Sequence, residues 1–191
     1  RGITMDRFEA LIDAILAIII TIIVLEIPYP SSGSWQAIYA LRYEFLIYAV
    51  SFMVCFNFWN YNNNIFHLVN KIDYKIIWIT GITLFVFSTL PYLTTFVGEN
   101  FFEFIPQLLY GLCFITAAIL TLINGYLLKK ADPGNIALHI ALSKHNTSST
   151  VILVIIGIIV GYLVYPPAII ICCLFSMLGT WFMPKIRIYL K

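Results

Sequence analysis

Six long apolar segments limit what this chain can fold into. A helix needs about 20 mostly apolar residues to cross a bilayer. The segments that come near this length are about 5–27, 38–65, 74–97, 101–128, 149–165 and 167–184. Only 10% of the residues are charged, whereas a soluble domain has about 25%. The sequence therefore predicts an all-α membrane protein, with residues 1–191 forming a single domain of six transmembrane helices.

The basic residues predict the orientation of these helices. Cytoplasmic loops of membrane proteins carry an excess of Lys and Arg. With the N-terminus in the cytoplasm, all of the 11 basic residues except Arg42 fall at cytoplasmic ends or loops. These residues are Arg1, Arg7, Lys71, Lys75, Lys129, Lys130, Lys144, Lys185, Arg187 and Lys191. We therefore expect both termini to lie in the cytoplasm.

The connections between the segments are mostly short. The exception is residues 129–148, which we expect to be the only substantial loop. Pro91 and Pro106 lie within the third and fourth segments. Proline lacks a backbone donor and often kinks a membrane helix, so these two residues are not specific evidence of gating. No internal repeat is visible, so the segments form one unit.

The four cysteines and three histidines do not form a recognisable site. No cysteine lies in a CxxC pair, and the histidines show no metal-ligand spacing. An intramembrane enzyme would need a nucleophile with a base, or metal ligands, at membrane depth. We therefore expect no enzymatic activity, no cofactor and no nucleic-acid partner.

The first segment carries polar residues that a simple membrane anchor does not need. Arg7, Glu9 and Asp13 lie near one end, Thr21 in the middle and Glu26 near the other end. Polar groups within a span are costly, so they usually face a protein interior or a water-filled path. This helix is the clearest sequence indication of a transport or channel function.

Helical periodicity separates the residues of this segment into two faces. At 100° per residue, Ile18, Ile22 and Leu25 form one stripe, and Thr21 adjoins it. Asp13 lies about 140° around the helix from Ile18. Two arrangements fit this pattern. In one, the stripe packs against other helices. In the other, several copies of the helix surround an axis, and the stripe lines a narrow hydrophobic passage.

The same residues carry a family resemblance. The first helix of the transmembrane protein 175 family of potassium channels resembles the pattern formed here by Arg7, Asp13, Ala14, Ala17, Ile18, Thr21, Leu25 and Glu26. Trp59 near the end of the second segment and Leu90–Pro91–Tyr92 late in the third resemble that family too. Over the last three segments the resemblance is limited to hydropathy and length.

The resemblance is to the prokaryotic, six-span members of the family. It implies a homotetramer in which the first helices line the pore and both termini lie in the cytoplasm. It places the pore constriction, or gate, at Ile18, Ile22 and Leu25, and ion selectivity at Thr21, with K⁺ passing near Ile18 and Thr21. The family lacks the TVGYG filter of ordinary potassium channels, as does this chain. Selectivity would then depend on a tight apolar constriction assisted by hydroxyl groups.

The chain departs from the family near the start of the first helix. The family motif is an Arg followed, after three residues, by Phe-Ser-Asp, and Leu11 and Ile12 stand here in place of the Phe and Ser. A His and an Asn of the second and third family helices correspond to Asn62 and Thr80. The resemblance implies a partly retained structural network of Arg7, Asp13, Trp59, Asn62 and Thr80. The sequence does not choose the partner of Asp13 among them.

We therefore expect a potassium-selective, leak-type cation channel, a multi-pass protein in the plasma membrane of a prokaryote. Its partners would be other copies of itself, K⁺ and lipid. The alternative is a secondary transporter of a cation or small solute, although such transporters often show the internal repeats that are missing here. An intramembrane enzyme and a non-conducting structural protein are the remaining competitors.

Overall fold

The computed structural model describes residues 5–70, 72–144 and 147–181, and the regular structure in these ranges is α-helical. The helices are α1 (Met5–Leu25), α2 (Trp35–Ala40), α3 (Arg42–Phe66), α4 (Tyr74–Phe87), α5 (Leu90–Glu99), α6 (Phe104–Ala131), α7 (Ile136–Lys144), α8 (Thr147–Leu163) and α9 (Ala168–Trp181). The prediction of an all-α protein is confirmed. Outside the described residues lie Arg1, Lys71, Lys185, Arg187, Lys191 and the end of the sixth segment, residues 182–184.

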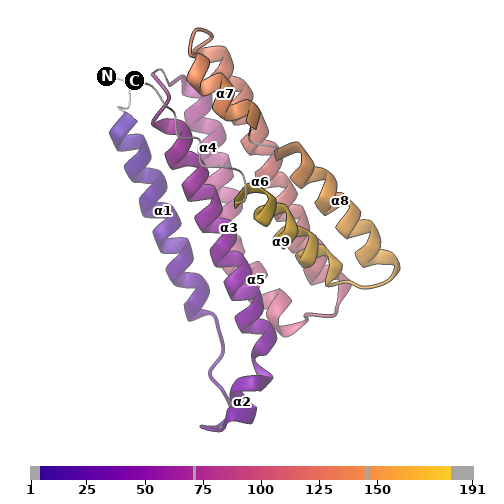
Figure 1. Ribbon diagram of the computed structural model, residues 1–191. Coiled ribbons are helices and arrows are strands. Elements are labelled where there is room, and N and C mark those ends of the chain that lie inside the picture. Colours follow the sequence, from indigo (N-terminus) through magenta and orange to yellow (C-terminus); the bar gives the residue numbers. More distant parts are fainter. Residues whose placement is uncertain (1–4, 71, 145–146, 182–191) are drawn as a thin grey trace.

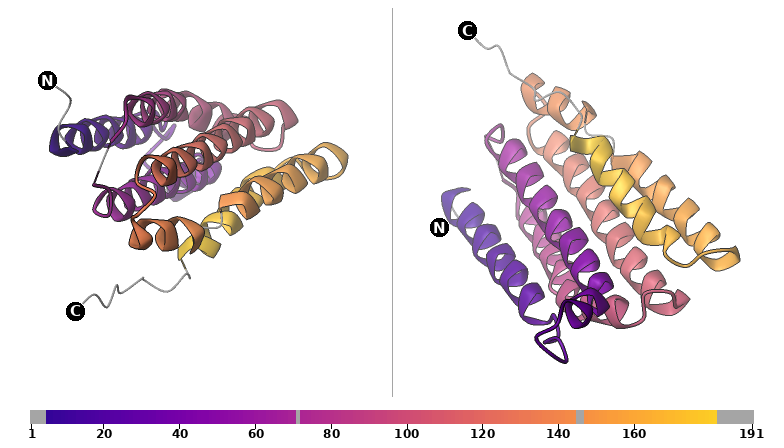
Figure 2. Two further views of the ribbon diagram at one scale, coloured as in Figure 1. Left: turned by 90° about the horizontal axis from the view of Figure 1, so that it is seen from above. Right: turned by 60° about the horizontal axis from the view of Figure 1, so that its bottom comes forward.

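The helices form an elongated bundle with α1 at one edge and the α8–α9 pair at the other (Figure 1). α1 contacts α3, α4 and α5, whereas α8 and α9 contact each other and α6. Figure 2 shows α8 and α9 side by side, next to α6. Because α1 lies at the edge, one of its faces has no neighbour within the described chain.

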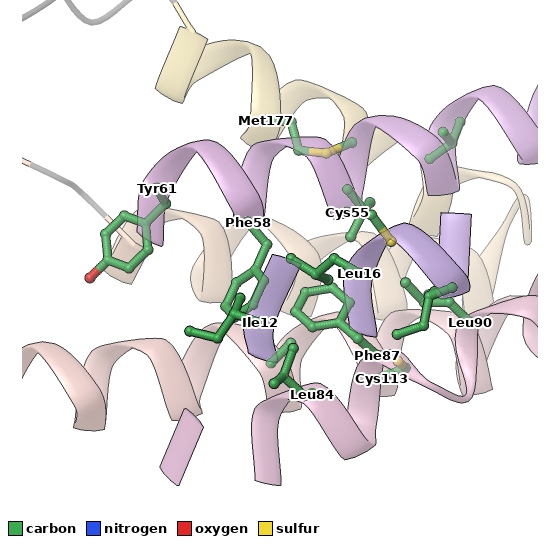
Figure 3. Packing of buried hydrophobic residues seen from close by; sticks show 14 of the residues in the cluster. Ile12, Leu16, Cys55, Phe58, Tyr61, Leu84, Phe87, Leu90, Cys113 and Met177 are labelled. Atoms are coloured by element: carbon green, nitrogen blue, oxygen red, sulfur yellow. The ribbon is translucent and has the colours of Figure 1, made fainter. Parts of the chain in front are cut away.

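α1 joins the core through one stripe of apolar side chains. The stripe recurs every three or four residues, which places its members on one face of a helix. Its members are each at most 4% exposed: Phe8, Ile12, Leu16, Ile19 and Ile23. Ile12 and Leu16 lie among side chains of α3 and α4 that include Phe58 and Leu84 (Figure 3). Burial of this stripe holds α1 against the bundle.

The third apolar segment is interrupted between α4 and α5. In a continuous helix the ring of Pro91 would clash with the carbonyl of Phe87, and α4 ends at Phe87. At the break, the carbonyl oxygen of Val86 accepts from the Thr89 hydroxyl at 2.7 Å and from the Thr89 backbone N–H at 3.1 Å. Pro91 thus lies where the third segment divides into two helices. Pro106 lies in the first turn of α6, where a backbone N–H has no helical partner, so it removes no hydrogen bond from that helix.

The prediction of a long loop at 129–148 is wrong. α6 continues to Ala131, and α7 follows after a short turn. The Asn135 side chain closes this turn by donating to the carbonyl oxygen of Leu68 at 2.6 Å and accepting from the backbone N–H of Leu138 at 3.1 Å. Leu138 is fully buried. Burial of apolar side chains therefore stabilises a helix in a segment whose polar composition suggested a loop.

Fewer stretches than the six predicted qualify as membrane spans by length and hydropathy. The qualifying stretches of the described chain are Met5–Leu25, Tyr74–Glu99, Phe104–Ala131 and Ile136–Leu163. α3 has 25 residues but ends in a run rich in asparagine, which lowers its hydropathy. The apolar part of α9 is shorter, at Ala168–Met177. The chain is thus an all-helical protein with four candidate spans.

The two ends of the bundle differ in their number of basic residues. The rings of Phe8 in α1 and Phe66 in α3 lie 5.5 Å apart, so the start of α1 meets the end of α3. The end of α6 meets the same region, because Asn70 donates to the carboxylate of Asp132 at 3.1 Å. The basic residues at this end are Arg7, Lys75, Lys129 and Lys130. Arg42 lies at the opposite end, at the start of α3. The described basic residues are therefore divided unevenly between the two ends, and the predicted orientation depends on this difference.

Candidate functional site

The face of α1 that points away from the core carries the predicted pore stripe. Ile18 is 58% exposed, Ile22 38% and Leu25 80%, and Thr21 is exposed beside them. Large exposed apolar groups on a protein of this kind meet lipid, another protein or a passage. Packing of the stripe against helices of the same chain does not fit these exposures, whereas packing against helices of another copy does.

The Thr21 hydroxyl is oriented by its own helix. It donates to the carbonyl oxygen of Ile18 at 2.8 Å. A hydroxyl has one proton to donate and two lone pairs that accept. Since the proton is used within the helix, the Thr21 oxygen presents lone pairs to whatever lies before the outer face of α1. This face therefore offers one oxygen ligand among apolar side chains.

Small side chains extend this outer face toward the start of α1. Ala10, Ala14 and Ala17 are exposed and recur at spacings of four and three residues. Small residues at such spacings allow helices in a membrane to approach closely. The outer face of α1 thus carries small side chains near the start of the helix and larger apolar side chains further along.

Asp13 is joined to α3 by a hydrogen bond. The indole Nε1 of Trp59 donates to Oδ1 of Asp13 at 2.8 Å. Among the partners that the sequence left open, the structure selects Trp59. The Trp59 ring also stacks on Phe56 of the same helix, at 5.6 Å between centroids. This contact fixes one turn of α1 against α3.

The other residues of the predicted network do not reach Asp13. The Asn62 amide is buried and donates to the carbonyl oxygen of Phe58 in its own helix at 2.9 Å. Thr80 is buried and accepts a hydrogen bond from Asn124 of α6 at 3.2 Å. Arg7 is exposed at the start of α1. The predicted network therefore separates into an Asp13–Trp59 contact and a contact between α4 and α6.

The two residues that depart from the family motif have opposite environments. Ile12 is 2% exposed and lies in the core, whereas Leu11 is 51% exposed. The buried Ile12 contributes to the apolar stripe that holds α1. In this chain, an apolar contact occupies the position at which the family motif has a serine hydroxyl.

Two buried polar contacts were missed by sequence reasoning. One is the partner of Thr80, Asn124. The other is a cluster that joins α3, α5 and α6, in which Ser51 lies 2.6 Å from the Thr94 hydroxyl and 3.0 Å from the Tyr110 hydroxyl. The available signal was weak: single polar residues inside apolar segments tend to hydrogen-bond neighbouring helices, but the sequence does not pair them. These contacts hold the bundle behind α1 together.

Metal ligation was not predicted for this chain. In residues 5–70, 72–144 and 147–181, no group of three or more His, Cys, Asp and Glu side chains is placed to hold a metal ion. The candidate site is therefore described by the outer face of α1 and its attachment to α3.

Comparison with known proteins gives a consistent result. A family model described as the endosomal/lysosomal potassium channel TMEM175 matches residues 7–91. A protein of Chryseobacterium sp. (strain P1-3), named a potassium channel, is 32% identical over 186 residues, which cover 97% of this chain and 96% of that relative. A potassium channel of Streptomyces collinus is 30% identical over 97 residues, 49% of this chain and 47% of that relative.

A solved structure is similar in fold. It is the crystal structure of a lysosomal potassium-selective channel TMEM175 homolog from Chamaesiphon minutus. The TM-score is 0.68 at 19% sequence identity, with 93% of this chain and 96% of the other chain covered. The two chains therefore share one helical fold over almost their whole lengths.

Proposed function

This chain belongs to the TMEM175 family, and we propose that it forms a potassium-selective, leak-type channel whose ion path is lined by α1. Two relatives named potassium channels support this function, one of them along almost the whole chain. The structural observation that carries the proposal is the division of α1 into a buried face and an exposed face that bears Ile18, Thr21, Ile22 and Leu25. The proposal requires no catalytic group and no cofactor, only K⁺ as the permeant ion.

The path is formed by several copies of the chain. One copy of α1 cannot enclose an ion, so we place four copies around a common axis, the assembly that the family resemblance implies. The small residues Ala10, Ala14 and Ala17 support close approach of neighbouring helices. We place six spans in each chain and both termini in the cytoplasm, because the basic end of the bundle fits the positive-inside rule. The bacterial relatives support a prokaryotic plasma membrane.

The constriction works by excluding water. Rings of Ile18, Ile22 and Leu25 side chains around the axis would form a narrow apolar passage, and such passages can gate by dewetting. The Thr21 oxygens, with lone pairs facing the path, would replace part of the water around a passing cation. Sodium holds its water more tightly than potassium, so a poorly coordinating passage disfavours sodium. Selectivity thus follows from the difference in dehydration cost.

The opposite face of α1 keeps this passage in place. Burial of Ile12 and Leu16 fixes the rotation of the helix, because turning it would expose both to lipid or water and lose their packing. The hydrogen bond between Trp59 and Asp13 fixes the height of α1 along α3. Asp13 is therefore a positioning residue in the proposal, and Ile18 and Thr21 are the residues that meet the ion.

The proposal can be tested by thiol accessibility in liposomes that carry a K⁺ gradient. In an Ile18→Cys variant, we expect a water-soluble, charged thiol reagent to abolish most of the K⁺ flux, because the thiol lies in the ion path. Ile152→Cys is the matched control, since Ile152 on α8 is 60% exposed and faces lipid in the proposal. The wild type controls for native cysteines, of which Cys55, Cys113 and Cys173 are buried.

Three results would contradict parts of the proposal. Equal inhibition of both cysteine variants, or inhibition of neither variant, would show that α1 does not line the ion path. Absence of K⁺ flux from the wild type would reject channel function. Saturable flux coupled to a second solute would favour the secondary transporter.

A further inference from the structure

A cavity of about 70 Å³ lies where α3, α4, α6, α8 and α9 meet. It follows from small residues at the boundary between the α8–α9 pair and the rest of the bundle. Ala117 and Ala118 of α6 are buried and line it. Larger side chains at these positions would fill the space. The proposed ion path uses none of these residues.

One side of the cavity is aromatic. Phe58 and Phe87 pack at 4.5 Å between ring centroids and form part of its wall (Figure 3), and Phe114 adds a third ring. Such rings favour contact with an apolar body.

The cavity is also lined by polar side chains, Asn57, Tyr61, Thr121, Thr147, Thr150 and Ser176, and two of their hydroxyls are oriented as acceptors. The Thr121 hydroxyl donates to the carbonyl oxygen of Ala117 at 2.8 Å, and the Ser176 hydroxyl donates to that of Cys173 at 2.7 Å. Both hydroxyls line the cavity. Because each proton is used within its own helix, each oxygen has lone pairs left for a ligand. A ligand with a hydrogen-bond donor is therefore favoured.

The lining also restricts the charge and size of a ligand. None of the described residues around the cavity is charged, so an ion would lose its hydration without a compensating partner. The partly open cavity of about 70 Å³ favours a small molecule.

We propose that this cavity binds a short-chain alcohol, whose hydroxyl donates to Thr121 or Ser176 and whose alkyl part contacts the aromatic wall. The alcohol is defined by its chemistry, as a small neutral donor with an apolar body. The site lies within one subunit, so binding depends on neither the ion path nor the number of subunits. Failure of the proposed channel function would leave this inference standing.

The test uses a short-chain alcohol that carries a photoreactive diazirine group, with the purified full-length protein in detergent. Modified peptides are identified by mass spectrometry, and excess 1-propanol is the competitor. We expect saturable labelling of α6 and α9 around the cavity. Replacement of both acceptors in a Thr121→Val/Ser176→Ala variant should weaken binding about fivefold, since the single donated hydrogen bond contributes about 1 kcal/mol.

Two further variants sharpen the test. Ala118→Leu fills the cavity and should abolish the labelling. Thr116→Val is the matched control, because Thr116 on α6 makes the same bond to its own helix, to Leu112 at 2.7 Å, but is exposed away from the cavity. Unchanged binding in this control would support the site. All variants should elute in gel filtration at the same volume as the wild type.

Other outcomes would overturn the proposal. Labelling that does not saturate, or that persists in Ala118→Leu, would show that the alcohol does not occupy the cavity. Equal affinity of the wild type and the double variant would show that the hydroxyls do not select the ligand. Equal binding of a diazirine probe of the same length without a hydroxyl would lead to the same conclusion.

Discussion

The α1 helix and the stretch that contains α8 are almost equally buried but differ in what they expose. In their most apolar windows, 28% of the α1 window and 29% of the Ile136–Leu163 window are buried. The exposed face of α8 is formed mainly by large branched side chains, Ile152, Ile155, Ile156 and Ile159, with Ser148 and Ser149 exposed at its start. The exposed face of α1 combines Ile18 and Ile22 with a hydroxyl and with alanines. The degree of exposure alone therefore does not separate the two helices, which differ instead in the side chains that form their exposed faces.

The largest effect on stability is expected from a substitution on the buried side of α1. Leu16→Ala should lower the free energy of unfolding by about 2–4 kcal/mol, because Leu16 is 1% exposed and its truncation leaves a cavity. Ile156→Ala on α8 should have a smaller effect, since Ile156 is 48% exposed. Thermal unfolding of the purified variants measures both. Equal shifts of the melting temperature would show that these two side chains contribute equally to the stability of the protein.

The next effect concerns the exposed isoleucines of the two helices. Ile18→Asn should raise K⁺ flux on the order of tenfold, as expected if a polar side chain wets the constriction and lowers its barrier by about 1.4 kcal/mol. Ile152→Asn should leave the flux unchanged. Flux from liposomes that carry a K⁺ gradient measures both. An unchanged rate for Ile18→Asn would argue against Ile18 as the gate.

A smaller effect is expected from the attachment of α1 to α3. Asp13→Ala and Trp59→Phe should each lower the stability of the assembled protein by about 1–2 kcal/mol, because each removes the same charge-assisted hydrogen bond. The double variant should lose little more than either single variant. Gel filtration at rising temperature reports the loss of assembly. Additive losses would mean that the two side chains act separately.

The smallest effect concerns selectivity. Thr21→Val keeps the shape of the side chain and removes its oxygen, so the preference for K⁺ over Na⁺ should fall about threefold, less than the effect of one typical hydrogen bond. Reversal potentials under mixed ionic conditions measure the change. Thr116→Val, on the exposed surface of α6, should leave the potential as in the wild type. Identical reversal potentials for both variants would show that Thr21 does not line the ion path.

Much of this molecule could be predicted from its sequence because helical periodicity and apolar length are local properties. The outer stripe of α1 is an example, since its 100° geometry predicted residues that the structure leaves exposed on one face. The break at Pro91 follows equally from local chemistry, because proline cannot continue the hydrogen bonding of a helix.

The remaining features depend on contacts between distant segments. The helix at 136–144 is stabilised by burial of Leu138 and by the contact of Asn135 with Leu68, 67 residues earlier in the chain. The partner of Thr80 could not be predicted, because the position of Asn124 depends on how α6 packs against α4. Replacement of the family serine by Ile12 indicated a loss of polar contact, and only the packed structure shows the apolar contact in its place.

The bond from the Thr21 hydroxyl to the carbonyl of Ile18 has a consequence for the sign of the permeant charge. A hydroxyl with a free proton can solvate chloride as readily as it solvates a metal cation. At Thr21 the proton points back into the helix, so a ring of such oxygens in the proposed pore would offer chloride no donor. Rejection of anions would then come from the orientation of a neutral dipole. Because no titratable group takes part, this rejection should be independent of pH, and screening by added salt should weaken it little.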